Sequence, residues 1–114
     1  MNFGLAGRVI VISGGTSGIG LATALAAARD GAHVAVLGTN EERMQSALDL
    51  LRQAAGGAVK VLGVRADVRD RQALDQAAAR VAAELGPVWG LVAAAGIGGA
   101  ARAEQLTLEE LNQV

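Results

Sequence analysis

The sequence predicts an α/β protein with a doubly wound, parallel sheet. Four short apolar runs alternate along the 114 residues with segments of helical spacing, and glycines or a Gly-Pro pair separate many of these segments. Strands separated by helices of about 10 to 15 residues are joined by right-handed crossovers, which make the strands parallel. In such a fold, helices cover the sheet on both faces.

The first strand is predicted over residues 9–12, where β-branched residues follow one another between glycines. An unbroken apolar run of this kind is typical of a strand that is covered on both faces of a parallel sheet. The next helix is predicted over residues 18–30, an alanine-rich segment. We expect four of its residues to face the sheet: Ile19, Ala22, Leu25 and Ala26.

The second strand is predicted over residues 33–37 and the second helix over residues 41–54, which Gly56-Gly57 ends. One apolar stripe of this helix has spacings of three and four residues and comprises Met44, Leu48, Leu51 and Ala55. The third strand and helix are predicted over residues 59–64 and 70–85. The buried face of that helix is predicted to hold Leu74, Ala77, Ala78, Val81 and Leu85.

A fourth strand is predicted over residues 88–94 and a loop over residues 96–103. Thr107 and Glu110 then have the spacing of a capping box, which predicts the start of another helix. No linker or low-complexity tract interrupts the chain, so residues 1–114 are predicted to belong to one domain.

Composition excludes several classes of function. Hydrophobic content of 52%, charged content of 18% and a net charge of −1 are typical of a soluble globular domain and give no field that attracts nucleic acid or an anionic membrane. No apolar run reaches the roughly 18 residues of a membrane span, so we expect a cytoplasmic protein. The chain has no cysteine, and its one histidine, His33, begins a strand, where a structural role is expected. No metal site is predicted.

A glycine-rich turn between the first strand and the first helix, Ser13-Gly14-Gly15-Thr16-Ser17-Gly18-Ile19-Gly20, is the main candidate site. Glycines let a phosphate approach the main chain, and the amides at a helix start point at the anion. The turn is therefore predicted to hold a dinucleotide pyrophosphate, with a purely structural tight turn as the alternative. Because a P-loop ends in Lys-Ser/Thr and this loop does not, ATP hydrolysis is disfavoured.

With these residues the chain resembles the short-chain dehydrogenase/reductase family. The family motif T-G-x-x-x-G-I-G is matched with Ser13 in place of threonine. Asp67-Val68 falls where the family contacts adenine, and Ala93-Ala94-Ala95-Gly96 falls where it has N-N-A-G. The resemblance implies a Rossmann-like sheet of strand order 3-2-1-4, here truncated after the fourth strand. It also implies hydride transfer between the nicotinamide of NAD or NADP and a carbonyl or alcohol carbon of a small molecule.

The cofactor-binding residues that this resemblance implies are Gly14, Thr16, Ser17, Gly18, Ile19, Gly20, Gly38, Thr39, Asn40, Asp67, Val68, Ala94 and Gly96. Alanines replace the usual asparagines at positions 93 and 94, so side-chain hydrogen bonds there are lost. Trp89 stands where the family often has aspartate, and packing is its favoured role. An alternative role for Asp67 is the N-cap of the third helix, and this role is compatible with a cofactor contact.

NADP is favoured over NAD. A carboxylate at the end of the second strand usually accepts hydrogen bonds from the ribose hydroxyls of NAD, and this chain has Gly38 there, followed by Thr39 and Asn40. Family members that prefer NADP often carry a cation at positions that Ser17 and Thr39 occupy here. Arg43 is the nearest cation, although a solvated helix position is its favoured interpretation.

The family's catalytic serine, tyrosine and lysine are not assigned in this chain. It has no tyrosine, and its one lysine, Lys60, lies in the predicted third strand, so the catalytic set would fall beyond Val114. The alternative is a non-catalytic module for dinucleotide binding or protein interaction, and a methyltransferase fits the motifs less well. We expect the fourth strand to expose an edge that favours association, and a full-length chain to form a homo-oligomer.

Overall fold

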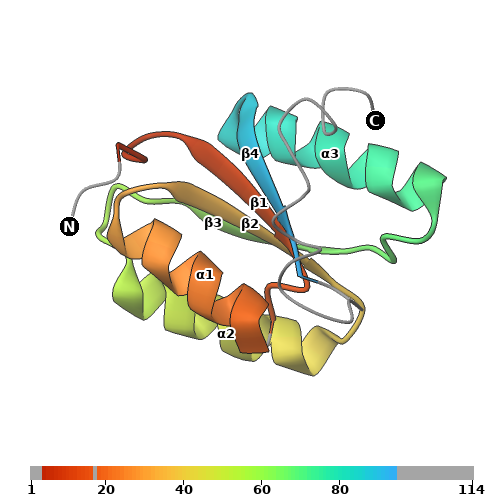
Figure 1. The fold of residues 1–114 in the computed structure, drawn as a ribbon, viewed down its shortest axis with the longest axis horizontal. Helices are drawn as coiled ribbons and strands as arrows, with labels where there is room; N and C mark the ends of the chain where they lie inside the picture. Colours follow the sequence, from red (N-terminus) through yellow and green to blue (C-terminus); the bar gives the residue numbers. More distant parts are fainter. Residues whose placement is uncertain (1–3, 17, 95–114) are drawn as a thin grey trace.

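The computed structural model describes residues 4–16 and 18–94, which form one four-stranded sheet with helices on both faces (Figure 1). The predicted loop at 96–103 and the helix expected from Thr107 lie outside the described residues. The strands are β1 (Val9–Ser13), β2 (His33–Gly38), β3 (Val61–Arg65) and β4 (Val88–Ala93), and the helices are α1 (Gly18–Arg29), α2 (Glu41–Ala54) and α3 (Arg71–Leu85).

The sheet has the strand order β3-β2-β1-β4, and all of its pairs are parallel, which confirms the predicted architecture. In Figure 1, α1 and α2 lie on one face of the sheet and α3 on the other. The chain moves from β1 outward to β3 and then returns to the far side of β1. This reversal places a topological switch point between β1 and β4, where open α/β sheets bind ligands outside the carboxyl ends of their strands.

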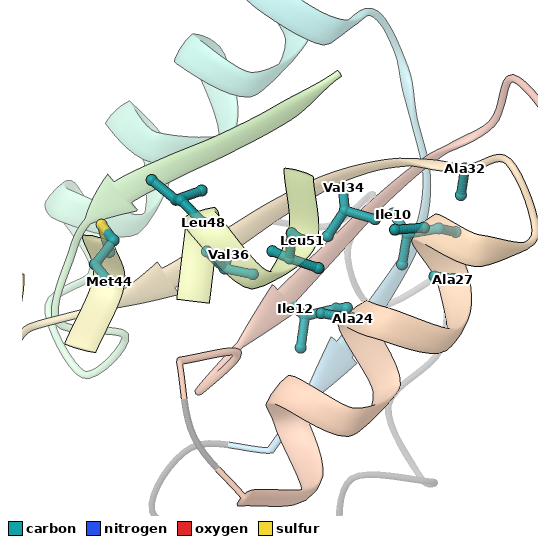
Figure 2. Packing of buried hydrophobic residues seen from close by; sticks show 11 residues of the cluster. Ile10, Ile12, Ala24, Ala27, Ala32, Val34, Val36, Met44, Leu48 and Leu51 are labelled. Atoms are coloured by element: carbon teal, nitrogen blue, oxygen red, sulfur yellow. The ribbon is translucent and has the colours of Figure 1, made fainter. Parts of the chain in front are cut away.

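The core on the α1 and α2 face is drawn in Figure 2. Strand side chains meet small residues of α1 and larger ones of α2, and the labelled members are Ile10, Ile12, Val34, Val36, Ala24, Ala27, Ala32, Met44, Leu48 and Leu51. The predicted α2 stripe is confirmed, with Ala55 partly buried. A Cβ on Gly63 would lie 2.8 Å from the Sδ atom of Met44, so a glycine in β3 lets α2 approach the sheet closely.

The buried face predicted for α1 was wrong at three of its four positions, since only Leu25 packs against the core. Ile19 is 64% exposed, Ala22 and Ala26 are exposed, and Leu25 is half-buried. The buried positions are instead Gly20, Ala24, Ala27 and Ala28. A Cβ on Gly20 would overlap the carbonyl oxygen of Gly14, so this backbone contact sets the rotation of the helix. In an alanine-rich helix, little amphipathic contrast exists to set it otherwise.

The face of α3 that packs against the sheet is the predicted one, but the N-cap of this helix is not Asp67. Ala77 and Val81 are buried against β1, β2 and β3, and Leu74 and Leu85 pack around them. The N-cap is Asp70, whose carboxylate accepts hydrogen bonds from the N–H groups of Gln72 and Ala73 at 3.0 and 3.2 Å. Asp67 is therefore not the N-cap, because the turn closed by Asp70 N–H and the Asp67 carbonyl places it one turn earlier.

The boundaries of all four strands differ from the predicted ones by one or two residues. β3 begins at Val61 rather than at residue 59, because the Val59 N–H is bonded to the Gly56 carbonyl in a turn at 3.0 Å. None of the helices in the described part of the chain is both long enough and apolar enough to cross a bilayer.

Polar groups at the amino edge of the sheet are bonded to one another. His33 Nδ1 accepts a hydrogen bond from the Lys60 N–H at 3.0 Å, which supports the structural role predicted for this histidine. The His33 N–H donates to the Arg8 carbonyl at 2.9 Å. The guanidinium of Arg8 lies over the Trp89 ring, 4.7 Å from its centroid, and Trp89 is 44% exposed.

Candidate functional site

The carboxyl ends of all four strands open into one cleft of about 680 Å³. Its lining includes eleven of the residues singled out from the sequence: Gly14, Thr16, Gly18, Ile19, Gly20, Gly38, Thr39, Asn40, Asp67, Val68 and Ala94. Ser17 and Gly96, the other two, lie outside the described residues. The fold thus gathers residues from four separate loops, while their binding of a cofactor stays a prediction.

The glycine loop is fixed to its neighbouring strands by backbone hydrogen bonds. Gly14 N–H donates to the Leu37 carbonyl at 2.9 Å, and Ala94 N–H donates to the Ser13 carbonyl at 2.9 Å. Gly14 has a φ of 73° and Gly18 a φ of 59°, a backbone region that favours glycine. The start of the loop is therefore held between β2 and β4.

The start of α1 forms the floor of the cleft. The first N–H groups of a helix have no partner within the helix, and they carry the positive end of its dipole. The Gly20 contact with Gly14 brings this helix start directly against the loop, and a Cβ on Gly18 would meet no atom within 4 Å. Open space beside unshared amides suits an anion such as a pyrophosphate, which can approach the main chain where no side chain intervenes.

The corner between β2 and α2 is shaped by Gly38 and Asn40. A Cβ on Gly38 would lie 3.1 Å from the Thr16 methyl carbon, so the two loops approach closely here. Asn40 is the N-cap of α2, and its Oδ1 accepts a hydrogen bond from the Arg43 N–H at 2.9 Å. Position 38 therefore brings no carboxylate to the cleft, and Thr39, Asn40 and Arg43 form its wall.

Asp67 and Arg69 form an ion pair in the third wall of the cleft, which is the loop between β3 and α3. Arg69 Nη2 lies 2.9 Å from Asp67 Oδ2, Arg69 Nε lies 3.1 Å from Oδ1, and the Arg69 N–H also donates to Oδ1. The side-chain hydrogen bonds of Arg69, followed by its backbone one, hold the pKa of Asp67 below its ordinary value. The same pairing raises the pKa of Arg69. Both oxygens of the Asp67 carboxylate therefore pair with Arg69 at an exposed position.

Four lining residues were absent from the predicted set: Leu37, Arg43, Ala66 and Arg69. Leu37 and Ala66 are strand-end residues that only the strand order brings to the cleft. For Arg43, the sequence favoured a solvated helix position, and the residue is exposed as expected, while it also lines the cleft. Arg69 could have been predicted from the sequence, because it lies two residues after Asp67 in the same loop, so both side chains can reach the carboxyl edge of the sheet.

The chain is similar to short chain dehydrogenases. The family model for short chain dehydrogenases matches residues 8–114. D-threitol dehydrogenase from Mycolicibacterium smegmatis is 38% identical over 109 residues, which cover 96% of this chain and 41% of that protein. Glycine betaine reductase from Emericella nidulans is 41% identical over 93 residues, which cover 82% of this chain and 7% of the reductase.

Solved structures give the same result for the fold. L-sorbose reductase from Gluconobacter frateurii, complexed with NADPH and L-sorbose, superposes with a TM-score of 0.79 at 36% identity, covering 87% of this chain and 37% of that one. NAD+-bound xylitol dehydrogenase gives 0.72 at 28% identity, covering 77% and 33%. The chain spans less than half the length of each of these relatives. From its glycine motif, its strand order and these matches, the chain belongs to the short chain dehydrogenase family.

Proposed function

We propose that the chain is the cofactor-binding part of an NAD(P)-dependent oxidoreductase, which transfers hydride between nicotinamide and a carbonyl or alcohol carbon of a small molecule. The observation that carries the proposal is the glycine loop at the start of α1, which opens into a cleft at the switch point of the sheet. Relatives of known structure support the cofactor class, since one contains NADPH and another NAD+.

Each loop of the cleft has a role in this proposal. The amides around Gly14, Gly18 and Gly20 would hold the pyrophosphate. Thr39 and Asn40 would contact the adenosine ribose, and Asp67 with Val68 would contact the adenine. Ala94 would lie toward the nicotinamide end, because it follows the strand on the other side of β1. When bound, the nicotinamide supplies the hydride acceptor or donor.

The alternative function stays dinucleotide binding without turnover. The only lysine, Lys60, lies at the amino edge of the sheet, where its N–H is bonded to His33, and the sequence has no tyrosine. A Tyr-Lys pair for proton transfer therefore does not form within this chain. Turnover, the substrate, homo-oligomer formation, a cytoplasmic location and the extent of the domain over residues 1–114 stay predictions.

Calorimetric titration with NADPH and with NADH tests the proposal. Gly18→Glu would place a carboxylate in the open space where the pyrophosphate is expected, so both affinities should fall at least about tenfold. Gly7→Glu is a matched control, because Gly7 also has a positive φ, of 77°, and a Cβ there would also meet no atom within 4 Å. Gly7 precedes β1 and lies at the opposite edge of the sheet.

Both variants add one negative charge and one strained backbone position, so their effects on folding should be similar. Only Gly18→Glu should weaken nucleotide binding. If neither nucleotide binds the unmodified chain, or if the two variants weaken binding equally, the proposed function is wrong. Binding without oxidation of NADPH by any carbonyl compound tested would favour the non-catalytic module.

A further inference from the structure

We propose that Arg69 reads the base of the bound dinucleotide together with Asp67, so that the pair selects adenine over a purine with a carbonyl group in place of the amine. This role rests on the proposed function, which assigns Asp67 to the adenine, and it adds Arg69 and the edge of the base that the pair recognises. It is supported by the hydrogen bonds that each atom of the ion pair makes and by the place of both residues in the cleft wall.

The Asp67 carboxylate keeps one acceptor position open. Its Oδ1 accepts two hydrogen bonds, one from the Arg69 backbone N–H at 2.9 Å and one from Arg69 Nε at 3.1 Å. Its Oδ2 accepts one within the described part of the chain, from Arg69 Nη2 at 2.9 Å. Because an ionised carboxylate has about four lone-pair sites on its two oxygens, Oδ1 is saturated and Oδ2 can accept one further hydrogen bond.

The Arg69 guanidinium has a free donor beside this open acceptor. Among the described residues, its side chain donates to Asp67 alone, through Nε and one N–H of Nη2. Two parallel contacts of this kind bring a guanidinium and a carboxylate close to one plane. The second N–H of Nη2 and the open lone pair of Oδ2 then lie on the same outer edge of that plane, and the two atoms are 2.9 Å apart. The ion pair thus presents a donor and an acceptor side by side.

One edge of adenine has the complementary pattern. Its exocyclic amine donates and its ring nitrogen N7 accepts, so the amine can donate to Asp67 Oδ2 while N7 accepts from Arg69 Nη2. Hypoxanthine has a carbonyl oxygen in place of the amine, and this oxygen would face the carboxylate oxygen with no proton between them. A polar group left without its partner costs binding energy, so the pair should discriminate against hypoxanthine.

The ion pair is accessible to a base in the cleft. Both residues line it, and the Arg69 and Asp67 side chains are 88% and 41% exposed. Val68, which lies between them in sequence, instead packs against the core on the α3 face. Because the Arg69 backbone N–H also binds Oδ1, the carboxylate keeps one of its contacts when the guanidinium is removed. Substitution of Arg69 therefore tests the donor more than the position of Asp67.

The test is a calorimetric titration with two dinucleotides: NADPH or NADH, whichever binds the unmodified chain more tightly, and its counterpart in which hypoxanthine replaces adenine. The titrations are repeated on Arg69→Met, Arg69→Lys and Arg65→Met. Arg65 is a matched control, because it is exposed, pairs with Glu41 at 3.7 Å and ends β3 without lining the cleft. We expect the unmodified chain to prefer the adenine dinucleotide by about tenfold, as for a base read by two hydrogen bonds.

Arg69→Met removes every side-chain donor, so it should weaken binding of the adenine dinucleotide by about fivefold and that of the hypoxanthine dinucleotide by less than about twofold. Arg69→Lys keeps the charge without the planar fork, so an intermediate preference is expected. Arg65→Met removes the same charge and should leave the ratio of the two affinities unchanged. Equal binding of both dinucleotides to the unmodified chain, or the same ratio in Arg69→Met as in Arg65→Met, would overturn the inference and leave the proposed function standing. Failure of NADPH and NADH to bind the unmodified chain would overturn both.

Discussion

The two edges of the sheet use their polar groups differently. At the amino edge, backbone groups and His33 satisfy one another, and the Arg8 guanidinium lies on the Trp89 ring. At the carboxyl edge, the same four strands end in loops that leave a cleft of about 680 Å³ with helix-start amides and the Arg43 side chain facing it. Polar groups at the amino edge are therefore bonded to one another, whereas the carboxyl edge leaves an open cleft, where we propose that an anionic ligand binds.

Gly20→Ala should have the largest effect on this contrast, because it removes the contact that builds the cleft. The added Cβ would overlap the Gly14 carbonyl, so loop and helix must move apart. We expect the free energy of unfolding to fall by about 3 kcal/mol, which outweighs the gain of about 1 kcal/mol in helix propensity. Urea denaturation measures this loss.

Gly56→Ala is the control for that measurement, since a Cβ at Gly56 would meet no atom within 4 Å. Its free energy of unfolding should stay within about 1 kcal/mol of the parent. Equal stability of Gly20→Ala and the parent would show that the close approach of α1 to the glycine loop is not required.

His33→Ala tests the amino edge and should have a smaller effect. It removes the acceptor of the Lys60 N–H, so the free energy of unfolding should fall by about 1 kcal/mol. NADPH affinity should not change, because His33 lies at the edge opposite the cleft. Lys60→Ala, which keeps the backbone donor, is the control and should be neutral. Weaker NADPH binding in His33→Ala would mean that the two edges are not independent.

Arg69→Gln should have the smallest effect, which is a change in the pKa of Asp67. Without the side-chain hydrogen bonds and the charge of Arg69, the pKa of Asp67 should rise part of the way toward its ordinary value of 3.8, because the backbone N–H of residue 69 still donates to Asp67 Oδ1. A pKa that is lowered in the folded chain stabilises the fold above the unfolded pKa, and this contribution is lost as pH falls through the folded value. The parent should therefore be more stable than Arg69→Gln above about pH 4, and this difference should shrink in more acidic solution.

Carbon-detected NMR titration of the Asp67 carboxyl group measures this pKa. Arg80→Gln, which breaks an ion pair with Glu84 on α3, is the control and should leave Asp67 unchanged. An unaltered pKa of Asp67 in Arg69→Gln would contradict the ion pair described for the third wall.

The sequence predicted the order and type of every described element, because glycines separate strands and helices and the apolar runs have distinct periods. It did not predict which face of α1 is buried, since an alanine-rich helix has little contrast between its faces and the Gly20–Gly14 contact decides its rotation. The candidate loops were predictable from their motif. That the exposed Arg43 would also line the cleft was not predictable, because this depends on where the neighbouring loops lie.

An NMR titration of the backbone amides with NADPH tests directly whether the cleft at the carboxyl edge binds the dinucleotide. We expect shifts for the amides of Gly14, Gly18, Gly20, Gly38 and Asp67 at the carboxyl edge, and none for those of His33, Lys60 and Trp89 at the amino edge. Saturable shifts confined to the amino edge, or no shift at the glycine loop at millimolar NADPH, would contradict it.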